Sequence, residues 1–79
     1  MPEVILYTRA GCHLCDEVKQ TLARARAHAA FTLHEIDIDS SPALRARYND
    51  EVPVVLIDGK KAFKYHLNEE DFLRVLNAR

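Results

Sequence analysis

Apolar residues in this chain form two kinds of pattern, short continuous runs and runs with helical spacing, and the two kinds alternate. Residues 4–7 and 54–57 are continuous apolar runs, which are typical of strands covered on both faces. Residues 31–38 predict another strand, whose apolar phase changes between Leu33 and Ile36 through a bulge or through partial cover of both faces. The helical spacing begins near His13 and places one stripe of side chains on a helix: Leu14, Val18, Leu22, Ala25 and Ala29.

Cap and turn residues predict where the remaining elements begin and end. Ser41-Pro42 is typical of a helix start, and this short helix should end near Asn49. Asp58-Gly59 predicts a two-residue hairpin, so that residues 61–65 return as an antiparallel strand. Asn68 is the expected cap of a last helix. The residues expected on the buried face of that helix are Phe72, Leu73, Val75 and Leu76.

The resulting order is β-α-β-α-β-β-α, which indicates one α/β domain over residues 1–79. The first helix is long enough to cross between two parallel strands. A hydrophobic content of 48% with 29% charged residues is ordinary globular composition. A net charge of −1 offers no basic field for nucleic acid, and no apolar run approaches the ~20 residues of a membrane span. No signal-peptide pattern is visible, so we expect a cytoplasmic protein. We also expect a monomer.

The candidate chemistry lies in the two cysteines of the chain, Cys12 and Cys15, which follow the first strand and open the first helix. At this spacing on a helical turn the two sulfur atoms come within bonding distance. The helix N-terminus favours the thiolate of Cys12, the form that attacks disulfides. Redox or metal chemistry is therefore favoured over a static disulfide. Zinc needs four donors and the scattered histidines lack ligand spacing, so no metal site within one chain is predicted, although a dimer sharing two cysteine pairs would supply four thiolates.

Residues 7–15, which read Tyr-Thr-Arg-Ala-Gly-Cys-His-Leu-Cys, resemble the active-site segment of glutaredoxins, with Arg9 where that family usually has lysine. Val52-Pro53 resembles the family's Thr-Val-Pro, with Glu51 in place of the threonine. Leu14-Cys15-Asp16 and Asp37-Ile38-Asp39 are similar to a branch of short, cytosolic bacterial glutaredoxin-like proteins. The resemblance covers nearly the whole chain. It implies a thioredoxin-like fold, with a four-stranded mixed sheet and three flanking helices.

The resemblance also implies a function, dithiol thiol–disulfide exchange. Cys12 would attack a substrate disulfide and Cys15 would resolve the mixed disulfide. The partners would be a disulfide-containing protein or a small thiol, together with an external thiol reductant or a reductase, and no organic cofactor or metal. In this superfamily the proline at Pro53 is cis, which exposes the backbone of Val52 for pairing with a bound peptide. A trans Pro53 would only open a strand.

Two further residues of the segment are candidates for substrate binding. Arg9 offers a positive charge near the thiolate and a contact for a substrate carboxylate, or else is a solvated loop arginine. His13, when protonated, favours the Cys12 thiolate, or else is an exposed spacer. A different class of function also remains open, a redox-silent or metal-thiolate binding module that uses the same cysteine pair.

Two departures from the glutaredoxin pattern predict poor use of glutathione. The glycine pair that follows the fourth strand in that family is missing, and Tyr65-His66-Leu67 stands there instead. The last helix, whose start holds a glutathione carboxylate in that family, begins with Glu69-Glu70-Asp71. Three acidic side chains beside an anionic ligand oppose its binding.

Overall fold

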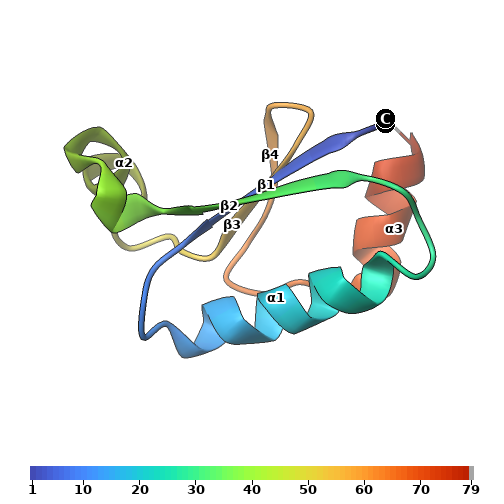
Figure 1. Cartoon of the computed structure of the whole chain (residues 1–79), viewed down its shortest axis with the longest axis horizontal. Helices are drawn as coiled ribbons and strands as arrows, with labels where there is room; N and C mark the ends of the chain where they lie inside the picture. The colour runs from blue at the N-terminus through green and yellow to red at the C-terminus, as the bar shows by residue number, and fades with distance from the viewer. Residues whose placement is uncertain (79) are drawn as a thin grey trace.

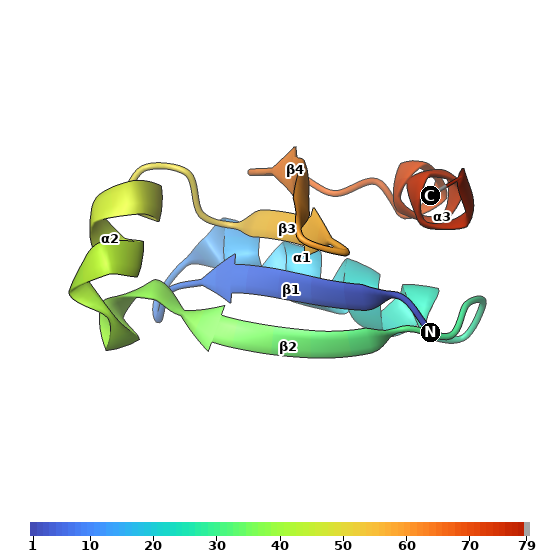
Figure 2. The ribbon, with the colours of Figure 1, turned by 90° about the horizontal axis from the view of Figure 1, so that it is seen from above.

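Four strands form one mixed sheet in the order β2-β1-β3-β4 (Figures 1 and 2). The computed structural model describes residues 1–78. β1 (Glu3–Thr8) pairs in parallel with β2 (Thr32–Asp37), and antiparallel with β3 (Val54–Ile57). β4 (Lys60–Lys64) returns antiparallel beside β3. This is the mixed sheet of the thioredoxin-like fold that the sequence predicted.

The three predicted helices are all present. α1 (His13–Ala25) runs back along the sheet between the parallel strands, and α3 (Glu69–Ala78) packs beside it on the same face (Figure 1). α2 (Pro42–Tyr48) covers one end of the opposite face (Figure 2). A short 3₁₀ helix, η1 (Ile38–Ser40), joins β2 to α2 and was not predicted. Among the described residues, no helix is long and apolar enough to span a membrane.

The main core lies between the sheet and the two helices α1 and α3. Side chains alternate along a strand, so Val4 and Leu6 of β1 point to this face and are fully buried. Phe72 of α3 contacts Phe31 in an edge-to-face arrangement, with ring centroids 5.3 Å apart. Val75 was expected on the buried face of α3 but is 38% exposed, because it lies off the stripe of Phe72 and Leu76.

A smaller core lies on the opposite face of the sheet, under α2. The rings of Tyr7 and Tyr48 stack there, with centroids 4.6 Å apart. Fully buried Ile38 and Val54 complete this cluster, with Leu44 of α2 packed against it. Both faces of the end of β1 that leads to Cys12 are therefore covered, which fixes the direction in which β1 enters the following turn.

Local signals in the sequence act as predicted. The hairpin between β3 and β4 uses Asp58 and Gly59, both with positive φ, at 49° and 84°. The side-chain oxygen of Ser41 accepts from the N–H of Leu44 at 3.4 Å. The side-chain oxygen of Asn68 caps α3 at 3.0 Å. β2 pairs with β1 without a register shift, so the phase change in β2 reflects partial cover of both faces rather than a bulge.

Candidate active site

The cysteine pair lies in the turn that leads from β1 into α1. Gly11 adopts a φ of +75° in this turn, a conformation that glycine adopts without strain. Cys12 is the N-cap residue of α1, and its sulfur accepts a hydrogen bond from the N–H of Cys15 at 3.1 Å. The sulfur thus takes the place of the serine or aspartate oxygen that usually satisfies a free N–H group at a helix start. The position favours negative charge on Cys12 in the reduced protein.

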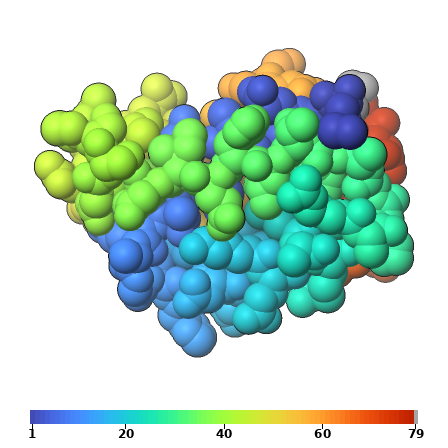
Figure 3. Space-filling view, in the orientation of Figure 1, coloured from blue at the N-terminus to red at the C-terminus, as the bar shows by residue number. Residues whose placement is uncertain are grey.

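Cys12 and Cys15 form a disulfide, with their Cα atoms 5.2 Å apart. The two residues differ in access to solvent. Cys12 is partly exposed, and the space-filling view shows the turn after β1 at the surface beside α1 and α2 (Figure 3). Cys15 is completely buried. An external thiol or disulfide therefore reaches the sulfur of Cys12 and not that of Cys15.

Val52 and Pro53 precede β3, and the peptide bond between them is cis, as predicted. The ring of Pro53 is buried. Its carbonyl accepts from the N–H of Tyr65 at 2.8 Å. Among residues 1–78, the backbone N–H and C=O of Val52 make no hydrogen bond. These two groups belong to the backbone that we expect to pair with a substrate strand.

Tyr65 is a residue of this region whose part the sequence did not predict. It adopts a φ of +69°, so the turn keeps a left-handed conformation although the glycine pair is missing. Its hydroxyl donates to the backbone oxygen of Asp50 at 2.8 Å. Together with the bond to Pro53, this contact fastens residues 50–53 to the end of β4. The sequence signal for this arrangement is the tyrosine that stands in place of the glutaredoxin glycine pair.

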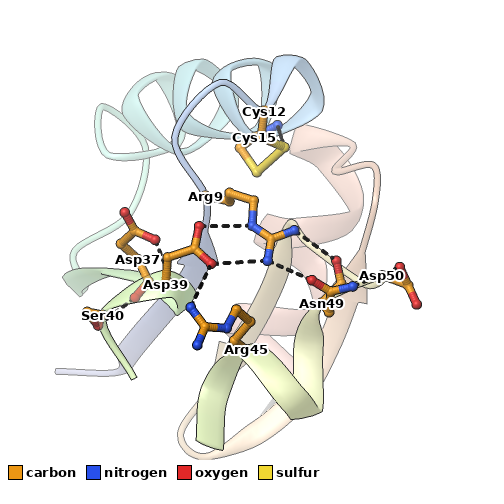
Figure 4. A network of polar contacts seen from close by, with 9 residues as sticks. All are labelled: Arg9, Cys12, Cys15, Asp37, Asp39, Ser40, Arg45, Asn49 and Asp50. Carbon is orange, nitrogen blue, oxygen red and sulfur yellow. Dashed lines mark hydrogen bonds and ion pairs between the residues drawn. A yellow bond between two sulfur atoms is a disulfide. The ribbon is translucent and has the colours of Figure 1, made fainter. Parts of the chain in front are cut away.

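Arg9 does not point its guanidinium freely into solvent. Its Nε and Nη2 groups donate to the two carboxylate oxygens of Asp39, both at 3.1 Å (Figure 4). Nη2 also donates to the side-chain oxygen of Asn49 at 2.7 Å, and Nη1 to its backbone oxygen at 3.3 Å. Arg45 lies 3.9 Å from the same carboxylate of Asp39. Arg9 thus joins the turn before Cys12 to η1 and to the end of α2. The alternative in which Arg9 is a solvated loop arginine is therefore wrong.

His13 is exposed at the first position of α1. Among the described residues it makes no hydrogen bond or ion pair, so its influence on the Cys12 thiolate stays a prediction. Asp16, in the same first turn, is also exposed and brings negative charge to the helix start. Within residues 1–78, no three His, Cys, Asp or Glu side chains gather as a metal site.

The acidic residues near the site are better compensated than the sequence suggested. Glu69 pairs with Arg24 of α1 at 3.0 Å, and Asp71 pairs with Arg74. Within residues 1–78 only Glu70 of the three acidic residues lacks an ion pair. The sequence shows three acidic residues here but not their partners, because Arg24 is 45 positions away from Glu69 and their contact depends on the fold.

Glu51, which stands where glutaredoxins have threonine, is also paired. Its carboxylate accepts from Lys61 at 2.7 Å and lies 3.6 Å from Lys64. The hydrogen bond from Lys61 is the main cause that lowers the pKa of Glu51 below its ordinary value of 4.5. Both lysines belong to β4, so Glu51 holds the segment before Val52 against the edge strand.

Comparison with known proteins agrees with this geometry. The model of the Glutaredoxin-like domain (DUF836) family matches residues 3–77. The chain belongs to this glutaredoxin-like family. It is 38% identical to an uncharacterised protein of Mycobacterium tuberculosis, over 86% of this chain and 75% of the relative. It is 34% identical to a protein of X. campestris, whose X-ray structure superposes with a TM-score of 0.80 over 96% of this chain and 97% of the other.

More distant structures share the fold alone. A mutant thioredoxin from Halobacterium salinarum superposes with a TM-score of 0.74 at 16% identity, over 98% of this chain and 73% of the thioredoxin. The protein is thus a glutaredoxin-like protein with a thioredoxin-like fold, and its bonded cysteine pair is consistent with a thiol–disulfide redox function.

Proposed function

We propose that this glutaredoxin-like protein is a dithiol thiol–disulfide oxidoreductase. The observation that carries the proposal is the Cys12–Cys15 disulfide at the start of α1, with one sulfur accessible and the other buried. A purely structural disulfide needs no accessible sulfur and no helix start. The N-cap position of Cys12 and its hydrogen bond from the N–H of Cys15 stabilise the charged form that starts the reaction.

The reaction consists of two exchanges. The thiolate of Cys12 attacks one sulfur of a substrate disulfide, forms a mixed disulfide, and releases the first substrate thiolate. The thiolate of Cys15 then attacks the sulfur of Cys12, closes the internal disulfide, and releases the second substrate thiolate. The substrate gains two electrons, and the protein loses them. An external dithiol or thiol must return these electrons before the next cycle.

The free backbone of Val52 supports a substrate with an extended peptide around its disulfide. Strand-like pairing with Val52 would align the substrate sulfur with Cys12. We therefore propose a disulfide-containing protein or a small peptide thiol as the partner. Arg9 contributes to this site by holding the turn before Cys12, since its hydrogen bonds go to Asp39 and Asn49.

Glutathione remains a poor candidate for the electron donor. The main reason is the pairing of Arg24 with Glu69, and not the number of acidic residues at the start of α3. A groove of about 310 Å³ lies between α1 and the turn after β4, and Arg24 is among its lining residues. That guanidinium is occupied by the carboxylate of Glu69. A ligand carboxylate would have to displace Glu69, while Glu70, which has no ion pair within residues 1–78, adds a negative charge to the same helix turn.

The experiment that tests the function compares the two cysteines with a peptide disulfide as substrate and dithiothreitol as reductant. Cys12→Ser should abolish exchange, because the accessible nucleophile is gone. Cys15→Ser, reduced and then freed of dithiothreitol before the substrate is added, should accumulate a mixed disulfide through Cys12, which mass spectrometry detects as the added mass of one substrate half. The double variant is the matched control, since the chain has only these two cysteines.

Limited alkylation of the reduced protein gives a second measurement of the same assignment. Iodoacetamide at a limiting dose should label Cys12, because Cys15 is buried. Preferential labelling of Cys15 would contradict the assigned roles. The binding-module alternative predicts a purified protein with bound metal and no exchange in any variant, and that result would replace the oxidoreductase proposal.

A further inference from the structure

Residues 49–52, between α2 and β3, are held in place by side chains from other parts of the chain. The segment ends at Val52, whose free backbone is the proposed pairing site for a substrate. Three consecutive residues of the segment are each fastened by a different side chain: Asn49 by Arg9, the backbone oxygen of Asp50 by Tyr65, and Glu51 by Lys61. Of these three contacts, only the first connects the segment to the turn that carries Cys12, since the other two come from β4 and the turn after it.

Arg9 contacts both sides of this connection. Its backbone oxygen accepts a hydrogen bond from the N–H of Cys12 at 3.3 Å. Its guanidinium donates to both oxygens of Asn49, at 2.7 Å to the side chain and at 3.3 Å to the backbone. Figure 4 shows the guanidinium between Asn49 and Asp39, with the cysteine pair above them in this view. One residue thus joins the turn of the nucleophile to the segment that would receive the substrate.

The orientation of this guanidinium is fixed from two sides. Asp39 accepts two hydrogen bonds from it, and Asn49 accepts two more. A planar, forked contact of this kind allows the side chain little rotation. A substrate carboxylate could bind in the same two-point manner only by displacing Asp39 or Asn49. The contacts therefore favour a positioning role for Arg9 over direct binding of the substrate.

A peptide substrate would have to meet two points of the protein at once. Its sulfur reacts with Cys12, and its backbone would pair with Val52, three residues after Asn49. Cys12 and Val52 lie on different segments, so their relative position decides whether both contacts form together. Small displacements matter here, because a shift of about 1 Å between reacting groups can slow a reaction strongly. A small disulfide without a peptide backbone needs only the contact with Cys12.

We propose that the contact between Arg9 and Asn49 sets the position of Val52 relative to Cys12, and so makes the protein selective for disulfides flanked by an extended peptide. Arg9 and Asn49 are positioning residues, because they act on the substrate through Cys12 and Val52. Asp39 supports them by fixing the guanidinium from the other side. The inference rests on the proposed function and deepens it, since it concerns the choice of substrate by the same cysteine pair.

The test measures how fast the reduced protein, freed of reductant, is oxidised by each of two disulfides. One is a neutral peptide disulfide with blocked ends, and the other is bis(2-hydroxyethyl) disulfide. In each reaction Cys12 and Cys15 give up two electrons and two protons and become the internal disulfide, while the substrate leaves as two thiols. Acid quenching, alkylation and mass spectrometry count the thiols that remain on the protein. The readout is the ratio of the rate constant for the peptide to that for the small disulfide.

Asn49→Ala removes one acceptor of the guanidinium and changes no charge. We expect the ratio to fall about tenfold, because Val52 is held less firmly. Arg9→Lys keeps the charge near Cys12 but cannot hold Asp39 and Asn49 together, so the ratio should fall in this variant too. Because both changes act on one contact, the double variant should have a ratio no lower than that of the more affected single variant. Asn49→Asp, which keeps an acceptor oxygen, should restore most of the ratio.

Arg45→Ala is the matched control. Arg45 also lies beside Asp39, but its side chain makes no hydrogen bond to residues 49–52 in the described part of the chain. The ratio for this variant should stay within about twofold of the wild type, as expected for an exposed ion pair.

An unchanged ratio in both Asn49→Ala and Arg9→Lys would overturn the inference, even if both variants were less stable, because the contact would then be structural only. An equal fall in Arg45→Ala would overturn it as well. If Asn49→Ala does not fold, Arg9→Lys makes the same comparison against Arg45→Ala. A wild-type protein that is oxidised by neither disulfide would instead refute the proposed function.

Discussion

The contacts of Arg9 give a prediction whose magnitude follows from the structure. Its side chain is 28% exposed and makes two hydrogen bonds to the carboxylate of Asp39 and two to Asn49. Arg9→Ala removes all of them. Arg45 lies near the same carboxylate, so Asp39 still has a cation beside it in this variant, and the loss of stability is smaller.

The expected loss is the sum of two contributions. A partly exposed two-point contact between arginine and a carboxylate stabilises a protein by about 1 kcal/mol. The two hydrogen bonds to Asn49 add roughly 0.5 kcal/mol each, the low end for bonds near solvent. Arg9→Ala should therefore lower the free energy of unfolding by about 2 kcal/mol, and each kcal/mol lowers the Tm of a domain this size by about 4–8 °C.

Urea denaturation at neutral pH, followed by circular dichroism, measures this loss. Arg74→Ala is the control, because Arg74 is 71% exposed and has one ion pair, with Asp71. A pair of this kind on a helix contributes only about 0.2–0.5 kcal/mol. Arg9→Lys keeps the charge but not the two-point contact, so its stability should fall between the wild type and Arg9→Ala. If Arg9→Ala lost no more free energy of unfolding than Arg74→Ala, the reasoning would be refuted.

Two further predictions concern the acidic residues near the site. The lowered pKa of Glu51, held down chiefly by its hydrogen bond from Lys61, contributes stability that is present above its ordinary value of 4.5 and is lost as the pH falls through the lower value of the folded state. Glu51→Gln should therefore flatten the acid side of the stability–pH curve, and an unchanged slope would contradict this. Glu69→Gln should lower the KM for a glutathione mixed disulfide more than Glu70→Gln does, because only the change at Glu69 releases Arg24. The opposite order would contradict binding of glutathione in the groove beside Arg24.

Most of the fold could be predicted from the sequence because the signals that set it are local. Asp58 and Gly59 adopt the positive φ values that a tight hairpin requires, and Asn68 caps the helix that it directly precedes. Cys12 and Cys15 are three residues apart, so a single helical turn brings their sulfurs together. Each of these features depends on a few neighbouring residues and needs no contact with distant parts of the chain.

The contacts around the cysteine pair could not be predicted in the same way. The partners of Arg9 lie 30 and 40 positions further along the chain, and they meet it only after β1, η1 and α2 are in place. In the sequence Tyr65 stands where a glycine pair is missing, yet its backbone still adopts a left-handed conformation. Tyr65 donates both of its hydrogen bonds to backbone oxygens of an earlier segment, those of Asp50 and Pro53.

The net charge near the cysteine pair therefore depends on which acidic side chains form ion pairs in the fold, and not on the number of acidic residues in the sequence. Glu51 and Glu69 are negative in a linear reading, but Lys61 and Arg24 face them in the fold. An ion pair presents a dipole instead of a net charge, and its field falls off faster with distance than that of a single ion. The electrostatic barrier to an anionic substrate is consequently lower than the sequence suggested. What opposes glutathione is chiefly the occupation of Arg24 by Glu69, a contact that a stronger or better-placed substrate carboxylate would have to break.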